Sequence, residues 1–228
     1  YPFFFKRVGN KVQVVEENVK FRAEKKSASS KAIDQLMSNS IIASAKVEGQ
    51  PNEKTGAILI QAEALFLRDY VGTGRSKRAS FKLDKGNSYY ETIQSFPYNS
   101  EIGVALHFTS SNPKYVFTLP DSKSAIHRYH MSWSAIPKSD YEPRLADDRV
   151  GHFLTMYQDY TNIYQESPYV RYINRWQLEK ADPTAELSKP KKPIVFWLEN
   201  TIPKEFRAAI REGILAWNKA FEAIGFKD

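Results

Sequence analysis

Cysteine is absent from the 228 residues of the chain, and its absence removes three kinds of chemistry. Disulfides, zinc sites with cysteine ligands and thiol nucleophiles are all excluded. The compartment is left open, because many envelope proteins fold without disulfides. Long apolar runs are also missing, and no stretch approaches the roughly eighteen apolar residues that a transmembrane helix needs. The sequence therefore predicts no membrane span.

Several short motifs are missing as well. The chain begins with a tyrosine and has no charged-then-apolar leader, so we expect any signal peptide of the parent protein to lie upstream or to have been removed. No G-x-S-x-G stretch marks a nucleophilic serine. The segment from Gly72 to Arg75 lacks the Lys-Ser/Thr step of a phosphate-binding loop. These observations predict no catalytic residue and no cofactor-binding residue.

The four histidines do not form the zinc-binding pattern H-E-x-x-H, in which two histidines four residues apart share one helical face. His127 and His130 are three residues apart in a segment that is typical of a strand. Side chains at that spacing point to opposite faces of a strand and cannot bind one ion together. His107 and His152 have no nearby histidine in the sequence. The sequence therefore predicts no metal site.

The chain is basic, with a formal net charge of +7. The basic residues cluster at Lys20, Arg22, Lys25, Lys26 and Lys31, at Arg75, Lys77 and Arg78, and at Lys189, Lys191 and Lys192. Such clusters are typical either of a surface that binds nucleic acid or another anionic polymer, or of solvated linkers. No nucleic-acid-binding motif accompanies them. We therefore favour solvated linkers and expect no nucleic-acid partner.

The hydrophobic pattern of the first half predicts short strands with one or two short helices. Residues 3–8 and 11–15 form an expected hairpin around Gly9-Asn10, and residues 19–23 an expected third strand. A short amphipathic helix over residues 32–37 follows, with Ser29 or Ser30 as its N-cap.

Further along, the pattern is less uniform. Residues 41–47 and 57–60 suggest another hairpin, whereas residues 62–70 fit either a helix or a strand. Residues 80–83 read as a short strand, and the turn-forming residues 84–87 are expected to end it.

The strand signal is clearest after residue 101. Residues 102–106, 115–119 and 124–134 predict an antiparallel meander, and residues 153–160 and 169–178 predict two more aromatic-rich strands. The aromatic side chains of these regions allow either a glycan-stacking platform or, as we favour, ordinary core packing. They include Tyr89, Tyr90, Trp133, Tyr157, Tyr160 and Trp176.

The last part of the chain predicts a strand at residues 194–198 and an amphipathic helix at residues 203–224. Phe206, Ile210, Ile214, Trp217, Phe221 and Ile224 would form its apolar stripe. Gly213 lies beside this stripe, where a missing side chain would let a sheet approach. We expect the pair to dock on residues 1–188 of a monomer, with Trp217 in the core. The overall prediction is an α+β fold, mostly antiparallel, with domains at 1–188 and 189–228.

Four stretches of the chain carry a resemblance to a known family. They are PIVFWLEN with the following helix GILAWNKAFEAIGFKD (residues 193–228), YEPRLADDRVGHF (141–153), RWQLEKADP (175–183) and FKRVGNKVQVVEENVKFRA (5–23). Together they resemble bacterial secreted zinc-dependent metalloproteases, in which an uncharacterised strand-rich region precedes a zincin-type catalytic domain. The second stretch is similar to the family segment PR-x-x-D-x-R-x-G-[YF]-F, and the third to R-x-x-L-E-K-x-D-P.

The resemblance implies that this chain is the upstream, non-catalytic region together with the first strand and helix of the peptidase domain. Zinc and the catalytic glutamate would then lie beyond Asp228, and this segment would be inactive alone. The implied partner is the downstream peptidase domain of the same polypeptide, with a protein or peptide substrate, and the implied location is secreted, periplasmic or cell-surface. The alternative is a self-standing β-rich module that binds glycan or protein at the bacterial envelope.

One charged loop stands out within residues 141–153. Arg144, Asp147, Asp148 and Arg149 alternate in charge and predict a largely buried network of ion pairs and hydrogen bonds that ties the loop to the domain. A calcium site is an alternative, since a loop with several carboxylates can supply the oxygen ligands. The resemblance adds a third possibility, that the loop shapes the active-site cleft of the parent enzyme.

Overall fold

The computed structural model describes residues 2–75 and 81–228, so Lys77, Arg78 and Ser80, named above, lie outside the described residues. The fold is α+β as predicted: strands hold 34% of the residues and helices 14%, and the strands are mostly antiparallel. Two compact units are present. Unit 1 comprises Tyr1–Asp140 and Met156–Val170, and unit 2 comprises Tyr141–Thr155 and Arg171–Asp228. The division into domains at 1–188 and 189–228 stays a prediction.

The first sheet of unit 1 contains the predicted N-terminal hairpin. It has the strand order β1-β2-β4, with β1 at Phe3–Val8, β2 at Lys11–Glu16 and β4 at Ser40–Lys46, all antiparallel. Gly9 begins the turn between β1 and β2 with a φ of +56°, a conformation that glycine adopts without steric cost. Val14 of β2 is fully buried. The hairpin prediction is confirmed.

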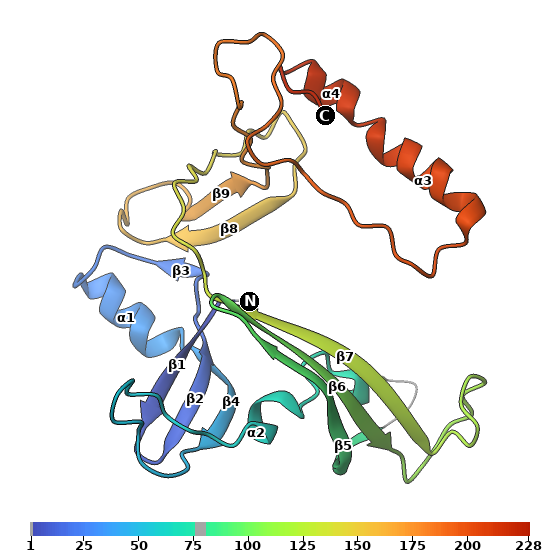
Figure 1. Cartoon of the computed structure of the whole chain (residues 1–228). Helices are drawn as coiled ribbons and strands as arrows, with labels where there is room; N and C mark the ends of the chain where they lie inside the picture. The colour runs from blue at the N-terminus through green and yellow to red at the C-terminus, as the bar shows by residue number, and fades with distance from the viewer. Residues whose placement is uncertain (1, 76–80) are drawn as a thin grey trace. The chain divides into compact units, whose positions relative to one another are not determined.

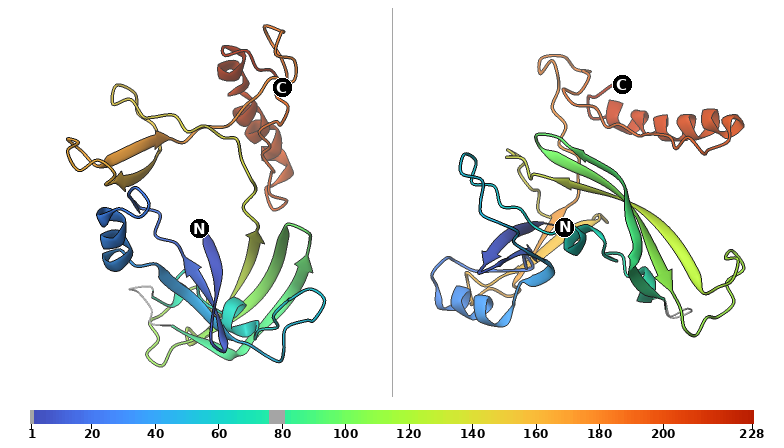
Figure 2. Two further views of the ribbon diagram at one scale, coloured as in Figure 1. Left: turned by 90° about the vertical axis from the view of Figure 1, so that its left-hand side faces the viewer. Right: turned by 60° about the horizontal axis from the view of Figure 1, so that its bottom comes forward.

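The second sheet is also antiparallel and has the order β5-β6-β7. Its strands, which lie side by side in Figures 1 and 2, are β5 at Lys82–Ser95, β6 at Asn99–Thr109 and β7 at Ser124–Ser134. Residues 102–106 of the central strand β6 are all buried. The larger hydrophobic core of unit 1 forms on one face of this sheet, around Leu67, Ile102, Val104, Leu106 and Phe108.

Two predictions about this sheet were wrong. Residues 115–119 are not a strand, and Tyr115 and Phe117 are exposed. The Ser122 hydroxyl accepts the backbone N–H of Val116 at 2.9 Å, so the segment folds back on itself in a turn. The strand expected at 80–83 does not end at the turn-forming residues either. β5 continues through them, with an irregularity in the pairing between Asp84 and Tyr89 that absorbs the extra residues.

The third sheet has the strand order β3-β8-β9. β3 is short, at Phe21–Arg22, and pairs in parallel with β8 at Leu154–Asp159. β9 spans Tyr169–Ile173, so the strand predicted over 169–178 is present but ends earlier.

The helices of unit 1 are short. α1 spans Ala28–Leu36, and its N-cap is Ser27, whose hydroxyl accepts the N–H of Ser30 at 3.0 Å. The expected caps Ser29 and Ser30 lie inside the helix instead. α2 is a single turn at Glu63–Phe66, followed by a 3₁₀ turn at Thr73–Arg75, so the ambiguous stretch 62–70 is partly helical.

The second expected hairpin of unit 1 is only partly formed. β4 occupies most of the predicted range 41–47, but residues 57–60 contribute a single bridge between Val47 and Ile60.

The predicted C-terminal helix is present in unit 2 as two pieces, α3 at Lys204–Leu215 and α4 at Asn218–Glu222. Pro203 precedes α3, and Gly225 follows α4 with a φ of +90°, as a helix end requires. The strand predicted at residues 194–198 is wrong, because this segment has irregular backbone. No helix among residues 2–75 and 81–228 is long and apolar enough to cross a membrane.

Candidate functional site

Unit 2 has very little hydrophobic core of its own. Among its residues, all of which the structure describes, Ile173 is the one buried apolar side chain and Ser188 the one buried polar residue. Its large side chains are instead exposed: Trp197 is 91% exposed and Trp217 70%. Trp217 is therefore not buried within unit 2, and the docking of this pair on residues 1–188 stays a prediction.

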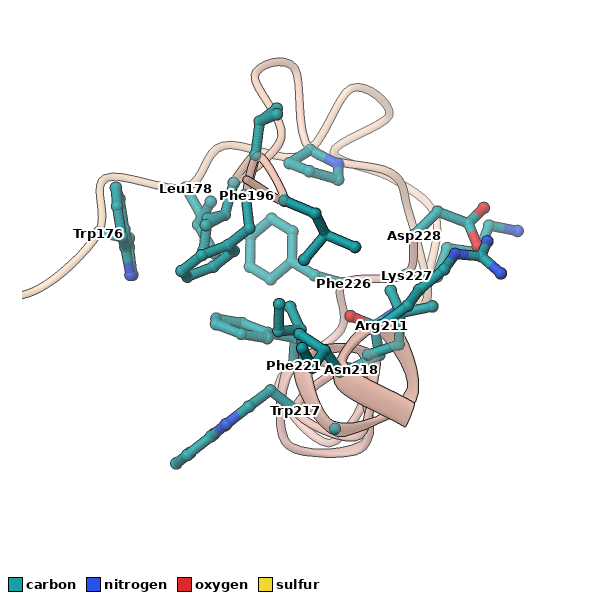
Figure 3. Close-up of a pocket in the computed structure, with 18 residues that line it drawn as sticks. Trp176, Leu178, Phe196, Arg211, Trp217, Asn218, Phe221, Phe226, Lys227 and Asp228 are labelled. Carbon is teal, nitrogen blue, oxygen red and sulfur yellow. The ribbon is translucent and has the colours of Figure 1, made fainter. Parts of the chain in front are cut away.

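The exposed side chains surround a hollow of about 970 Å³ within unit 2. We call this the apolar hollow. Its apolar lining residues include Trp176, Leu178, Ile194, Val195, Phe196, Leu198, Ile210, Ile214, Leu215, Trp217, Phe221 and Phe226. Figure 3 shows Phe196, Phe221 and Phe226 gathered around the hollow, whereas the Trp217 indole points away from them. The residues predicted as strand and helix thus supply the two sides of one apolar surface.

One rim of the apolar hollow is polar. Arg211, Lys227 and Asp228 lie together on the side away from Trp176 (Figure 3). Asp228 also pairs with Lys189 at 3.1 Å. Gly213 lines the hollow as well, and a Cβ added there would meet no atom within 4 Å. The prediction that a sheet packs close to Gly213 is not met by any described residue.

A compact turn at residues 180–190 holds the end of the chain beside the hollow. The Lys180 ammonium donates to the backbone oxygens of Ala185 at 2.9 Å and Glu186 at 2.8 Å. The Ser188 N–H donates to the backbone oxygen of Gly225, and the Lys227 N–H donates to the backbone oxygen of Ser188. These two bonds flank Phe226. Gly225 has a φ of +90°, and a Cβ there would lie 2.9 Å from the backbone oxygen of Glu186, so the position favours glycine.

The predicted network in the loop 141–153 is present in a smaller form. Arg149 donates from Nε to Oδ1 of Asp147 at 2.9 Å and from Nη2 to Oδ2 at 2.5 Å. Hydrogen bonds from the side chain and backbone of Arg149 lower the pKa of Asp147 to about 2. Arg144 contributes its backbone oxygen, which accepts the N–H of Ile173 at 3.0 Å.

The predicted burial of this network is wrong. Arg144, Asp147, Asp148 and Arg149 are all exposed, and the Arg149 side chain is 87% exposed. The loop keeps its place through backbone hydrogen bonds to β9, including Ala146 to Arg171, instead of through buried charges. Among the described residues, no group of three His, Asp or Glu side chains could hold a metal ion.

The histidines of unit 1 lie on the second sheet. His127 and His130 of β7 point to opposite faces, as predicted: His127 stacks edge-on against Phe108 of the core, and His130 pairs with Glu101 at 2.6 Å. Glu101 also accepts hydrogen bonds from Ser132 at 2.7 Å and Asn99 at 2.6 Å. These three partners lower its pKa, with Ser132 contributing most.

A second polar group on the same face was not predicted. Asp84 Oδ2 lies 3.0 Å from Nδ1 of His107, and Nε2 of His107 lies 2.8 Å from the Ser124 hydroxyl. The pKa of Asp84 is lowered, chiefly by the hydrogen bond from Asn87 and then by that from His107. The three residues span 40 positions in the sequence, from Asp84 to Ser124. The turn-forming residues after Leu83 also concealed that β5 continues past Asp84.

The prediction of core packing holds for only part of the aromatic set, because Tyr89 and Trp176 are exposed whereas Trp133 is partly buried against other rings. Trp133 lies with its ring centroid 4.8 Å from that of Phe3 and 4.9 Å from that of Phe66. Together with Phe5 these rings surround a smaller hollow of about 500 Å³ between the two sheets.

The chain was compared with known protein families, curated proteins and solved structures. A family model described as "Domain of unknown function (DUF5117)" matches residues 3–181. No curated protein and no solved structure matches the chain.

Proposed function

Because the chain belongs to the family of the domain of unknown function DUF5117, whose description assigns no activity, we propose a function from its surface. The chain is a part of a secreted zinc-dependent metalloprotease that is non-catalytic in peptide hydrolysis, and it scaffolds or regulates the peptidase domain of the same polypeptide. Its partner binds to the apolar hollow of unit 2. The secreted, periplasmic or cell-surface location of the parent protein is part of the same proposal.

The near absence of a core in unit 2 carries this proposal. Ordering a residue costs on the order of 1–2 kcal/mol of backbone entropy, which apolar burial normally offsets. Unit 2 orders two helices and a long irregular segment, yet it buries one apolar side chain, Ile173. Its remaining apolar side chains face the hollow and solvent. An exposed apolar surface of this kind is typical of a protein–protein interface.

The residues around the hollow favour a protein partner over a small molecule or a polymer of sugars. The lining is aromatic and aliphatic on both sides, with charged groups confined to the rim at Arg211, Lys227 and Asp228. An apolar centre with a polar rim is the usual composition of a stable protein interface. The resemblance of residues 193–228 to the entry of a zincin-type domain supports the peptidase domain as this partner.

Zinc has no proposed site in this chain. Under this proposal the metal and its catalytic glutamate belong to the peptidase domain, and this chain supplies a surface against which that domain packs.

Binding to a separately produced peptidase domain tests the proposal. Isothermal titration of the 228-residue chain with the downstream polypeptide of the same gene should show saturable binding. Phe196→Asp, which places a carboxylate in the hollow, should weaken binding at least tenfold, because an unpaired charge would be desolvated there. Phe117→Asp is the matched control, since Phe117 is an exposed aromatic residue of unit 1, outside the hollow.

Three results would overturn the proposal: no binding, equal weakening by both variants, or tight binding of a polysaccharide with no binding of the peptidase domain. The last result would favour the alternative function, a self-standing envelope module that binds glycan. The effect of the added chain on peptide hydrolysis by the peptidase domain then separates regulation, which changes the rate, from scaffolding, which changes the stability of the domain.

A further inference from the structure

The polar face of the second sheet holds an aspartate, a histidine and a serine in one hydrogen-bonded line. The strand register places Asp84 directly opposite His107, and Ser124 lies on the neighbouring strand two residues from Ile126, the partner of His107. The imidazole lies between the other two groups, with Nδ1 3.0 Å from Asp84 and Nε2 2.8 Å from the Ser124 hydroxyl. His107 and Ser124 are partly exposed, so a small molecule can reach the hydroxyl.

The chemistry of each group determines which atoms in this hydrogen-bonded line carry the protons. The lowered pKa of Asp84 keeps it a carboxylate at neutral pH, and a carboxylate only accepts hydrogen bonds. Nδ1 of His107 must therefore carry the proton in the bond to Asp84. Nε2 of the neutral ring is then an acceptor, and the Ser124 hydroxyl donates to it. This is the arrangement in which a histidine can take the proton of a serine that attacks a carbonyl group.

The irregular part of β5 fixes the aspartate and the histidine. Asp84 accepts the backbone N–H of Gly86 at 3.1 Å and the side-chain amide of Asn87 at 2.7 Å. The Ser88 hydroxyl donates to the backbone oxygen of Asp84 at 2.7 Å and accepts the backbone N–H of His107 at 3.0 Å. Both side chains are thus held before any ligand binds, which is the usual requirement for a catalytic group.

We propose that Ser124 is a nucleophilic serine, activated by His107 and Asp84, that accepts acyl groups from small activated esters. The Ser124 oxygen forms a bond to the carbonyl carbon of the ester while its proton passes to Nε2 of His107. The carbon–oxygen bond to the alcohol breaks, and the alcohol leaves with the proton from Nε2. Water then attacks the acyl-serine, with His107 again accepting and returning the proton, and releases the carboxylic acid.

Slow turnover is expected from the surroundings of Ser124. The backbone N–H groups of Lys123 and Ser124 both donate to Oδ1 of Asp121, at 2.9 and 3.2 Å. They are therefore not free to stabilise the negative oxygen that forms during acyl transfer, and the loss of one such donor typically lowers a rate by roughly 10²–10³. Covalent labelling of the serine is consequently a more sensitive test than turnover.

A matched control lies on the same strand and the same face. Ser132 also has a histidine and a carboxylate beside it, but both Ser132 and His130 bind to Glu101, and the histidine does not lie between the other two groups. Its hydroxyl donates to a carboxylate, which is a weaker base than an imidazole. Ser132 is also exposed, whereas Ser124 is only partly exposed. Accessibility alone would favour labelling of Ser132.

The test uses a fluorophosphonate probe on the full 228-residue chain, with intact-mass detection and peptide mapping. We expect one equivalent of label on Ser124, complete loss of labelling in Ser124→Ala, and an unchanged rate in Ser132→Ala. His107→Gln should lower the labelling rate at least a hundredfold and Asp84→Asn at least tenfold.

Labelling of Ser132 as fast as Ser124, no label on Ser124, or a rate unaffected by His107→Gln would each overturn the proposal. A thermal unfolding measurement on every variant shows whether it is folded under the labelling conditions, so that the labelling rates can be compared. If His107→Gln unfolds early, the ratio of Ser124 to Ser132 labelling in the wild-type chain and the labelling rate of Asp84→Asn still decide the outcome. Neither measurement depends on the peptidase domain, so the result is independent of the proposed function.

Discussion

Individual charged residues stabilise this chain mostly at its surface, and the Arg149–Asp147 pair is the clearest case. Both hydrogen bonds of the pair are short, yet the Arg149 side chain is 87% exposed. Water therefore screens the interaction, and exposed pairs contribute little to stability. We expect Arg149→Ala to leave the unfolding temperature unchanged within error in a thermal melt followed by circular dichroism. A clear decrease would show that the loop is covered in solution.

Acid should lower the stability of the folded chain, because it protonates carboxylates that accept hydrogen bonds in the fold. Hydrogen bonds lower the pKa of the Asp84 and Glu101 carboxyls, which lie on the polar face of the second sheet. The unfolded chain therefore binds protons at a higher pH than the folded chain, so the stabilisation is complete above the unfolded pKa values and is lost as pH falls through the folded ones. Urea unfolding midpoints should decrease between pH 4 and 2.

Glu101→Gln tests whether this group contributes to the acid sensitivity. The variant should show a shallower loss of stability over that range, because glutamine does not titrate. An identical pH dependence in the variant and the wild type would show that Glu101 has the same pKa in both states.

Gly103 is a residue whose lack of a side chain is required by packing. A Cβ at this position would lie 2.5 Å from the Thr92 hydroxyl oxygen, and the Gly103 N–H donates to that oxygen at 3.2 Å. Gly103→Ala should cost about 1–3 kcal/mol in chemical denaturation, as overpacking does. Gly213→Ala is the control, because Gly213 lies in α3 with open space around it and should gain about 0.5–1 kcal/mol of helix stability. An equal change in the free energy of unfolding for the two variants would contradict this prediction.

Among the elements, those whose partners are close in sequence were predictable. The Gly9-Asn10 turn and the alternation on either side of it determine β1, β2 and their register. The long strands β6 and β7 were likewise indicated by their apolar residues. β5 was underestimated because Asp84, Gly86 and Asn87 are turn-forming residues, and only the pairing of the strand with β6 shows that they form an irregularity instead. The polar line through His107 depends on this pairing and therefore could not be predicted.

The failure at residues 194–198 has a different cause. The segment has the composition of a buried strand, but a strand needs a neighbour to accept and donate its backbone hydrogen bonds. No described residue pairs with it. Composition indicates what an element prefers, whereas the presence of a partner decides whether that element forms.

Truncating a large side chain should lower the free energy of unfolding when the residue lies in the second sheet, but not when it lies in the C-terminal helical segment. Leu106 is 1% exposed, whereas Trp217 is 70% exposed. Leu106→Ala should lower the free energy of unfolding by about 2–5 kcal/mol, as expected for a buried leucine. Trp217→Ala should leave the main unfolding transition unchanged in the isolated chain. A large loss on Trp217→Ala would show that this indole is buried in solution.

For the whole molecule, the unequal cores of the two units predict unequal stability. Unit 1 buries two apolar clusters, and unit 2 buries a single apolar side chain. Native-state hydrogen exchange should therefore show strong protection in β6 and weak protection in α3 and residues 194–198. Adding the peptidase domain should raise protection in unit 2 and leave β6 unchanged. Equal protection in both units of the isolated chain would contradict the assignment of a separate, weakly stabilised unit.

The sparse core of unit 2 also has a consequence for how long the protein survives in a cell. A segment that opens often exposes its backbone to proteases, and degradation follows the population of the open form. Copies whose apolar hollow is covered would persist, whereas uncovered copies would be removed. The amount of the chain in the cell would then follow the amount of its partner, because copies with an uncovered hollow would be degraded.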